Sequence, residues 1–331
     1  MALVITACGQ TAPATDLELM AGFEAQIFAE GFVGPTQMIV AANGDLIIAE
    51  LNGAENDATG RIIRVDHTNV TDRTVLQEGL DKPTGLAVVG DRLWIMERQR
   101  LSVTDLVPGA EREIVVEELP FNGRSQGTLS VTEDGRLLYN TSGAKRGAER
   151  VAGSGMIFAI DDAAYGGRTP TVIARGFKHA YATLEAPDGQ LWSVEMTDGT
   201  FDGERGSDEL VPLSPGDDAG WPQCVDDNRP VVQYGGTAAM CALSPRSHAL
   251  FDPGATPTSF VIAPWDPDQF VVALWLSGRV VTVPRTATVG QPHEPKLFIG
   301  GITSPQHLVV EDDRVLVSDH ETGAIYAITA E

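Results

Sequence analysis

Imidazole and cationic side chains precede several short apolar runs in this chain of 331 residues. They are Lys82, Arg124, Lys178, His179 and His307. A histidine can act as a general base because its pKa lies close to neutrality, and lysine and arginine bind anionic groups. These residues therefore indicate a site that binds a small anionic molecule and removes a proton. The alternative for each imidazole is a packed, hydrogen-bonded side chain.

The remaining histidines fit this site less well. We expect His67, His293 and His320 in surface turns, and we place His248 in an inserted region.

Acidic residues also recur, at one repeated position after an apolar run. The residues at this position are Glu50, Glu97, Thr141, Glu195, Leu274 and Asp319. Four of these six residues are acids, and a ring of carboxylates would favour a divalent cation, since hard cations prefer oxygen ligands. Alternatively, each acid caps nearby backbone or forms a local ion pair.

A long polar stretch, residues 206–224, adds four further acids. They are Asp208, Glu209, Asp217 and Asp218. With Glu195, the pair Asp208 and Glu209 would form a calcium site. The alternative is a loop pinned by Trp221 and a disulfide, with its acids in solvent.

The strands that must position these residues follow from an internal repeat. Apolar runs of strand length follow turns of Gly, Asn or Asp, and they begin at positions 46, 93, 137, 191, 270 and 315. Such spacing is typical of four-stranded units, and the long fourth interval indicates an insertion. We predict an all-β, six-bladed β-propeller. Residues 23–28 would supply the outer strand of the last blade and thereby close the ring.

The beginning of the chain predicts export. Residues 1–8 end in Ile5-Thr6-Ala7-Cys8 and resemble part of a bacterial lipoprotein signal, so Cys8 is the expected lipidation site. Residues 9–18 would be a tether and residues 19–331 a single propeller domain. We expect Cys224 and Cys241 to form a disulfide, which suits a periplasmic or cell-surface lipoprotein.

Charge limits the partners that this chain can bind. It has 46 acidic and 23 basic residues, a formal net charge of −23. Such an excess disfavours nucleic acid, whose phosphates need clustered Lys and Arg. No internal apolar segment is long enough to span a membrane, so we expect membrane contact only through a lipid anchor. A closed propeller exposes few strand edges, and we expect a monomer.

Several segments together resemble the soluble PQQ-dependent glucose/sorbosone dehydrogenases, also called aldose sugar dehydrogenases. The resemblance extends over residues 23–329, and it is carried by residues 174–177, 188–192, Asp208-Glu209 and Gly220-Trp221-Pro222-Gln223-Cys224. The resemblance implies that pyrroloquinoline quinone (PQQ) and calcium bind at the mouth of the central channel of the propeller. It also implies a histidine that takes a proton from a sugar hydroxyl while hydride passes to the quinone.

The chain departs from this family at the catalytic positions. Arg124 stands where the family has its catalytic histidine, and Lys178-His179 replaces an Arg-Asn pair. The cofactor-facing lysine of the family aligns near Leu276 and Ser277, and its last arginine pair near Thr303 and Pro305. Arg124 cannot act as a base near neutral pH.

Three hypotheses follow for function. In the first, an exported sugar dehydrogenase uses His179 as a relocated base, with Arg124 assisting catalysis, and Arg124, Lys178, His179 and His307 bind the quinone or the substrate. In the second, a non-catalytic propeller binds a carbohydrate or an anion at the same mouth. In the third, a lactonase-like hydrolase uses the acidic ring and a metal-bound water.

Overall fold

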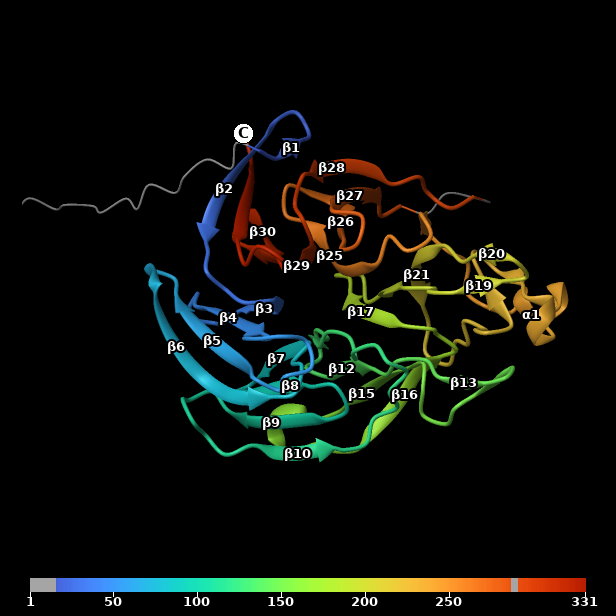
Figure 1. Cartoon of the computed structure of the whole chain (residues 1–331), viewed down its shortest axis with the longest axis horizontal. Coiled ribbons are helices and arrows are strands. Elements are labelled where there is room, and N and C mark those ends of the chain that lie inside the picture. The colour runs from blue at the N-terminus through green and yellow to red at the C-terminus, as the bar shows by residue number, and fades with distance from the viewer. Residues whose placement is uncertain (1–15, 287–290) are drawn as a thin grey trace, which may run out of the picture.

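The computed structural model describes residues 16–286 and 291–331, and it is a closed ring of six β-sheets (Figure 1). Each blade is an antiparallel sheet whose first strand lies nearest the axis. The blades comprise, in order, β3 (Pro35–Val40), β4 (Leu46–Glu50), β5 (Gly60–Asp66) and β6 (Asn69–Leu80); β7 (Gly85–Val89), β8 (Arg92–Met96), β9 (Leu101–Asp105) and β10 (Glu113–Val116); β11 (Ser130–Val131), β12 (Leu137–Asn140), β15 (Met156–Ile160) and β16 (Pro170–Arg175); β17 (Ala180–Glu185), β18 (Leu191–Glu195), β21 (Asp208–Leu213) and β24 (Ala249–Phe251); β25 (Pro257–Ala263), β26 (Asp266–Leu274), β27 (Arg279–Pro284) and β28 (Lys296–Gly300); β29 (Pro305–Glu311), β30 (Arg314–Asp319), β31 (Ile325–Ala330) and β2 (Phe23–Ala29).

The ring closes through the N-terminal strand, as the sequence predicted. β2 pairs antiparallel with β31, with Phe23 opposite Ala330 and Ile27 opposite Tyr326. A short strand, β1 (Glu18–Leu19), adds to the edge of blade 5 by pairing with β28. Glu18 is therefore already part of the sheet structure, although it falls at the end of the range predicted as a tether. Cys8 lies outside the described residues.

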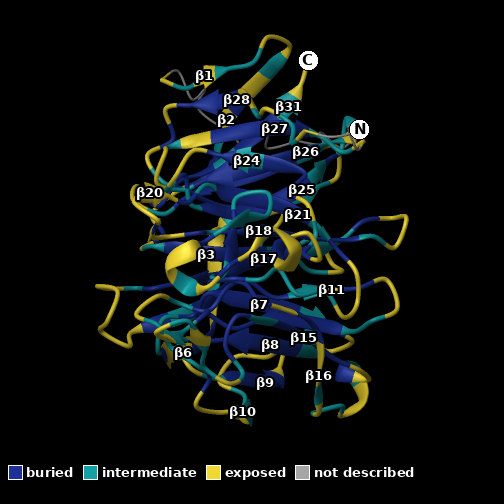
Figure 2. Ribbon diagram, turned by 90° about the vertical axis from the view of Figure 1, so that its right-hand side faces the viewer, coloured by how far each residue is buried: buried dark blue, intermediate teal, exposed yellow. Residues whose placement is uncertain are grey.

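The cores lie between neighbouring blades, because each sheet is buried on both faces. One such core joins Trp192, Phe260 and Phe270 from blades 4 and 5. Another joins Ile47, Leu86 and Ile95 from blades 1 and 2. Figure 2 shows buried strands and exposed loops at the periphery. No helix of the described chain is long and apolar enough to cross a membrane.

The insertion lies inside blade 4, between β21 and β24, rather than between units four and five. It contains β22 (Cys224–Val225), β23 (Arg229–Pro230), the 3₁₀-helix η2 (Val232–Tyr234) and α1 (Ala238–Cys241). Asp208 and Glu209 precede this insertion and begin strand β21, so the expectation that they lie in a loop was wrong. The other short elements are β13 (Lys145–Arg146), β14 (Glu149–Arg150), η1 (Ala163–Tyr165), β19 (Thr200–Phe201) and β20 (Glu204–Arg205).

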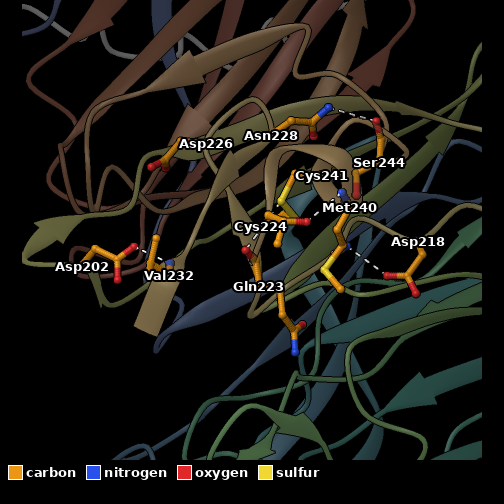
Figure 3. Close-up of a disulfide and its surroundings, with 12 residues drawn as sticks. Asp202, Asp218, Gln223, Cys224, Asp226, Asn228, Val232, Met240, Cys241 and Ser244 are labelled. Carbon is orange, nitrogen blue, oxygen red and sulfur yellow. Dashed lines mark hydrogen bonds between the residues drawn. A yellow bond between two sulfur atoms is a disulfide. The ribbon is translucent and has the colours of Figure 1, made fainter. Parts of the chain in front are cut away.

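A disulfide holds this insertion, and it confirms the predicted pairing of Cys224 with Cys241 (Figure 3). The side chain of Asn228 donates to the carbonyl oxygen of Ser244 at 3.1 Å across the same loop. Trp221 is buried beneath it with Phe201, Val225 and Val231. The insertion is therefore a small cross-linked unit on the rim of blade 4, and its disulfide is of the kind found in exported proteins.

The remaining acids of the insertion also form structural contacts. The carboxylate of Asp218 forms ion pairs with Arg150 at 2.8 Å and with Arg175 at 3.0 Å. Asp217 accepts the backbone N–H of Ser214 at 2.7 Å. The loop is therefore pinned as the structural interpretation expected, but Asp217 and Asp218 bond to protein groups instead of lying free in solvent.

Gln37 links three blades beside the axis. Its buried side-chain oxygen accepts the N–H groups of Leu86 at 2.7 Å and Leu129 at 3.0 Å. Its amide nitrogen donates to the Leu129 carbonyl oxygen at 2.8 Å. Each bond satisfies a backbone group that has no access to water, so this one side chain ties blade 1 to blades 2 and 3.

We expect Gln37→Leu to lower the free energy of unfolding by about 3 kcal/mol, since it leaves three buried backbone groups unpaired. Urea unfolding followed by circular dichroism measures this change. Gln233→Leu, at an exposed position of the insertion, is the matched control and should unfold like the wild type. Equal midpoints for the two variants would contradict this role of Gln37.

Candidate functional site

A central cavity of about 500 Å³ opens at one end of the ring, where loops of all six blades meet. The loops entering the first strand of a blade contribute residues such as Lys82, Arg124 and Lys178. The loops leaving the second strand contribute residues such as Asp198, Trp275 and His320. Both kinds of loop were expected at this end, so the location of the cavity agrees with the repeat.

Charge inside the central cavity differs from charge on the whole chain. Its lining includes four cations and four acids, namely Lys82, Arg124, Lys178 and Arg205, and Glu55, Asp198, Asp208 and Glu321. The chain as a whole has twice as many acids as bases, 46 against 23. The cavity lining is therefore less acidic than the chain as a whole, and its cations give a negatively charged ligand groups to bind.

The cations differ in how far they are already paired. Lys82 pairs with Glu55, and Arg124 pairs with Asp198. Lys178 and Arg205 form no ion pair among the described residues. Lys178 is largely buried, and its ammonium lies 5.8 Å from the centre of the Trp221 ring. Burial lowers the pKa of Lys178, while the charge of Asp198 acts in the opposite direction. A desolvated lysine of this kind gains most from an anionic ligand.

The backbone around Lys178 and His179 is held by three hydrogen bonds. Glu195 accepts the N–H of Lys178 at 2.5 Å, and the carbonyl oxygen of Lys178 accepts the N–H of Gly143 at 2.7 Å. The carbonyl oxygen of His179 accepts the N–H of Met196 at 3.0 Å. Gly143 is required for this close approach, because a Cβ there would lie 2.3 Å from the Phe177 carbonyl oxygen.

His179 lies at the wall of the central cavity and is 3% exposed. Its Nε2 atom is buried and has no hydrogen-bond partner among the described residues. Burial, followed by the charges of Lys178, Arg124 and Lys82, lowers its pKa to about 3. The imidazole is therefore neutral at physiological pH and has a nitrogen available to accept a proton.

Arg124 and His307 lie in different surroundings from His179. The Arg124 side chain is 59% exposed at the rim of the cavity. His307 is buried between blades, its Nδ1 accepts the Met38 N–H at 3.4 Å, and it does not line the cavity. Burial lowers the pKa of His307 to about 3. The packed interpretation therefore suits His307, and its predicted role in cofactor binding has no support from this position.

Other site residues were missed by the sequence analysis. His320 was expected in a surface turn, but it lines the central cavity with Trp275, its ring centre 6.1 Å from that of the indole. Asp198 and Arg205 also line the cavity and were not identified. The repeat could have identified two of the missed residues, because His320 directly follows Asp319 and Trp275 directly follows Leu274, and both Asp319 and Leu274 stand at the repeated position after the second strand. The remaining histidines, His67, His248 and His293, lie outside this lining.

The acidic ring has a structural role in the described chain. Glu50 accepts the N–H of Val33 at 2.9 Å, Glu97 that of Asp81 at 2.7 Å, and Asp319 that of Ser304 at 3.0 Å. Glu195 accepts the N–H of Lys178 in the same way. Each of the four acids therefore holds the loop that enters its own blade. The capping interpretation accounts for all four acids.

The three predicted calcium ligands do not share one site. Asp208 lines the central cavity, where its two oxygens accept the N–H groups of Thr197 at 2.8 Å and Thr256 at 2.7 Å. Glu195 and Glu209 are opposite each other on β18 and β21 and line a separate small cavity of about 20 Å³.

Among the described residues, a cluster with metal-ligand spacing occurs only at Asp45, Asp66 and His67, on blade 1. Within it, Asp45 and His67 already pair at 2.9 Å.

The small cavity encloses two carboxyl groups with little compensation. Burial raises the pKa of Glu195 well above its usual value, and the charge of Glu209 adds to this effect. Burial raises the pKa of Glu209 from 4.5 to about 7, although Ser247 donates a hydrogen bond to it. The indole N–H of Trp221 and the hydroxyl of Thr197, which belong to residues lining this cavity, have no partner. At least one of the two carboxyl groups therefore holds a proton near neutral pH.

This pair predicts a loss of stability as the pH rises. The folded protein retains a proton that the unfolded chain releases, so the contribution of this pair to the free energy of unfolding falls from about pH 4.5 to about pH 7, opposite in sign to the contributions of the buried His179 and His307. The expected loss is up to about 3 kcal/mol. Glu209→Gln keeps an acceptor for Asp226 N–H and a partner for Ser247, and it should flatten this dependence. Urea unfolding at pH 5 and pH 8 measures the effect, and Glu78→Gln, at an exposed site, is the control. If the free energy of unfolding of Glu209→Gln changed with pH as much as that of the wild type, the pair would not hold the proton.

Solved structures share this fold. No protein-family model and no curated protein matches the chain. The calcium structure of a Trichoderma reesei enzyme of Carbohydrate-Active Enzymes Family AA12 is similar, with a TM-score of 0.81, 16% identity, and coverage of 97% of this chain and 98% of that chain. The holo PQQ domain of a pyranose dehydrogenase from Coprinopsis cinerea has a TM-score of 0.77, 16% identity, and coverage of 97% and 99%. The PQQ-bound aldose sugar dehydrogenase of Streptomyces coelicolor has a TM-score of 0.72, 16% identity, and coverage of 95% and 100%. At this identity the likeness establishes the fold.

Proposed function

We propose that the central cavity is the active site of a sugar-oxidising enzyme that binds an anionic quinone cofactor and a polyhydroxylated substrate. One observation carries this proposal: the consecutive residues Lys178 and His179 both line one cavity, and among the described residues the Lys178 ammonium forms no ion pair and the His179 Nε2 has no hydrogen-bond partner. This combination offers a base for a hydroxyl proton next to a cation for a carboxylate. Solved propellers of the same fold, namely the holo PQQ domain, the PQQ-bound aldose sugar dehydrogenase and the calcium structure, support the choice of cofactor.

The residues of the cavity fit the organic part of such a cofactor. PQQ is a planar tricarboxylate with an ortho-quinone, and Lys178 and Arg205 would hold its carboxylates because neither is already paired. Trp275 offers an apolar face for a planar ring. When bound, the quinone would accept the hydride released from the substrate carbon. Calcium has less support, because Asp208 already uses both oxygens on backbone N–H groups.

The chain's own groups would act as follows. His179 Nε2 accepts the proton of the substrate hydroxyl, and the backbone bonds around Lys178 and His179 fix its position. Lys178 beside it opposes protonation of the imidazole in the empty cavity. An anion bound at Lys178 would neutralise this charge and so make His179 a stronger base only when the cofactor is present.

A second candidate is a propeller that binds a carbohydrate or an anion without catalysis. It is favoured by Arg124, which occupies the catalytic histidine position of the resembling family and is already paired with Asp198. The metal-dependent hydrolase has less support, because the acidic ring on which it rested caps backbone N–H groups.

We also infer that the protein works outside the cytoplasm. The disulfide supports an oxidising compartment, since such bonds rarely persist in the cytosol. Lipidation of Cys8, membrane contact through that lipid, a monomeric state and the absence of nucleic-acid partners remain predictions. Mass spectrometry of the N-terminal peptide from a bacterial host tests lipidation.

Quinone binding and turnover separate the two candidates. We expect PQQ to raise the melting temperature of the wild type, because it binds the folded state, and Lys178→Met to weaken binding about tenfold. Lys296→Gln, at an exposed residue of β28, is the control and should bind PQQ normally. If PQQ does not raise the melting temperature, with or without calcium, the dehydrogenase proposal is overturned. Binding without aldose-dependent dye reduction would favour the second candidate.

His179→Asn should retain PQQ binding and lose at least about 100-fold in turnover, the usual effect of removing a general base. In the free protein the pKa of His179 is lowered to about 3, and an anion bound at Lys178 would raise this pKa. Turnover of the PQQ-loaded wild type should therefore fall at low pH as His179 becomes protonated, at a pH above 3. Steady-state rates of the wild type and His179→Asn from pH 4 to pH 8 test the role, and an acidic limb that persists unchanged in His179→Asn would contradict it.

A further inference from the structure

An ion pair crosses the mouth of the central cavity. Arg124 comes from the loop before β11 in blade 3, and Asp198 from the loop after β18 in blade 4. Both residues line the cavity, and their side chains are 59% and 54% exposed. The pair therefore lies at the outer part of the cavity, in front of the buried Lys178 and His179.

Asp198 affects several charges around it. It pairs directly with Arg124, and its charge favours the charged form of Lys178. Together with burial, which is the larger effect, it also favours the neutral form of Asp208, while two backbone N–H bonds to Asp208 act in the opposite direction. The carboxylate of Asp198 thus attracts Arg124 and Lys178 and repels Asp208, as the carboxylate of a ligand at this point would.

We propose that Asp198 occupies the place of a ligand carboxylate, and that the substrate is a polyhydroxylated carboxylic acid of the hexuronate class. This inference rests on the proposed function, in which the cavity binds a sugar-like substrate. Exposed ion pairs contribute little stability, so a ligand carboxylate can replace Asp198 on Arg124, whose guanidinium suits bidentate binding.

The rest of the lining suits the hydroxyl groups of such a molecule. Thr84, Thr258 and Gln306 line the cavity. Their side chains already donate to Gly127 O, Pro305 O and the Tyr181 hydroxyl, and each retains an oxygen that can accept a hydrogen bond from a sugar hydroxyl. A neutral aldose would leave the Arg124–Asp198 pair unchanged, whereas a hexuronate would exchange it for a new one. The pair therefore determines whether the cavity discriminates acidic from neutral sugars.

Calorimetric titration of the full chain with glucuronate and with glucose, in the absence of quinone, tests this inference. We expect the wild type to bind glucuronate more tightly than glucose. Asp198→Asn should tighten glucuronate binding about fivefold and leave glucose unchanged, because it removes a weak competitor for Arg124. Arg124→Gln should weaken glucuronate binding about tenfold, with little effect on glucose. Asp188→Asn, which removes an exposed partner of Arg285 elsewhere, is the control and should match the wild type.

Several outcomes would overturn the inference. They are equal affinity of the wild type for glucose and glucuronate, binding of neither sugar, and weaker or unchanged glucuronate binding in Asp198→Asn. A parallel titration with PQQ keeps the two proposals separate. If PQQ binds and glucuronate shows no preference, only the substrate class fails. If glucuronate follows the expected pattern and PQQ does not bind, the cavity is a sugar-acid site and the oxidoreductase fails.

Discussion

Closure of the ring by β2 is the constraint on which the other features depend. Pairing of Phe23–Ala29 with Ile325–Ala330 joins strands from the two ends of the described chain in one sheet and covers the open edge of β31. The central cavity exists only in the closed ring, because its lining comes from all six blades. A gap at blade 6 would separate Gln306 and His320 from Thr36 and Leu51, which face them from blade 1. The first strand of the fold therefore determines the geometry of a site to which it contributes no side chain.

Buried acidic side chains fix the positions of the loops at one end of the closed ring. Glu50, Glu97, Glu195 and Asp319 end or follow the second strands, and each accepts N–H groups from the loop entering the same blade. A carboxylate is well suited to this role, since hydrogen bonds to a charged acceptor are stronger than neutral ones. In blade 4 the loop so held carries Lys178 and His179. The structural role of Glu195 is thus the reason that these two side chains face the cavity together.

The sequence predicted the fold more completely than the site. Spacing of the turns located all six blades, because propeller blades repeat a local strand pattern, and residues 23–28 were correctly assigned to closure. The Cys224–Cys241 pairing and the cavity-facing positions of Arg124, Lys178 and His179 were also predicted. His320, Trp275 and Asp198 were not, since their positions depend on how turns run in space. The sequence also could not distinguish cation ligands from caps, because Glu195 looks the same in either role until its backbone partner is known.

Electrostatics connects the fold to the chemistry proposed here. A protein of net charge −23 repels anions at long range, yet four of its 23 basic residues line one cavity. Two of these cations are paired with acids at the rim, whereas Lys178 forms no ion pair among the described residues and is favoured in its charged form by the more distant Asp198. Burial lowers the pKa of Lys178, so a bound anion would stabilise its charged form. Burial is also the main cause of the lowered pKa of His179, and the charge of Lys178 adds to it. An anion at Lys178 would remove this second contribution, so in the proposed mechanism ligand binding and the basicity of His179 are coupled through Lys178.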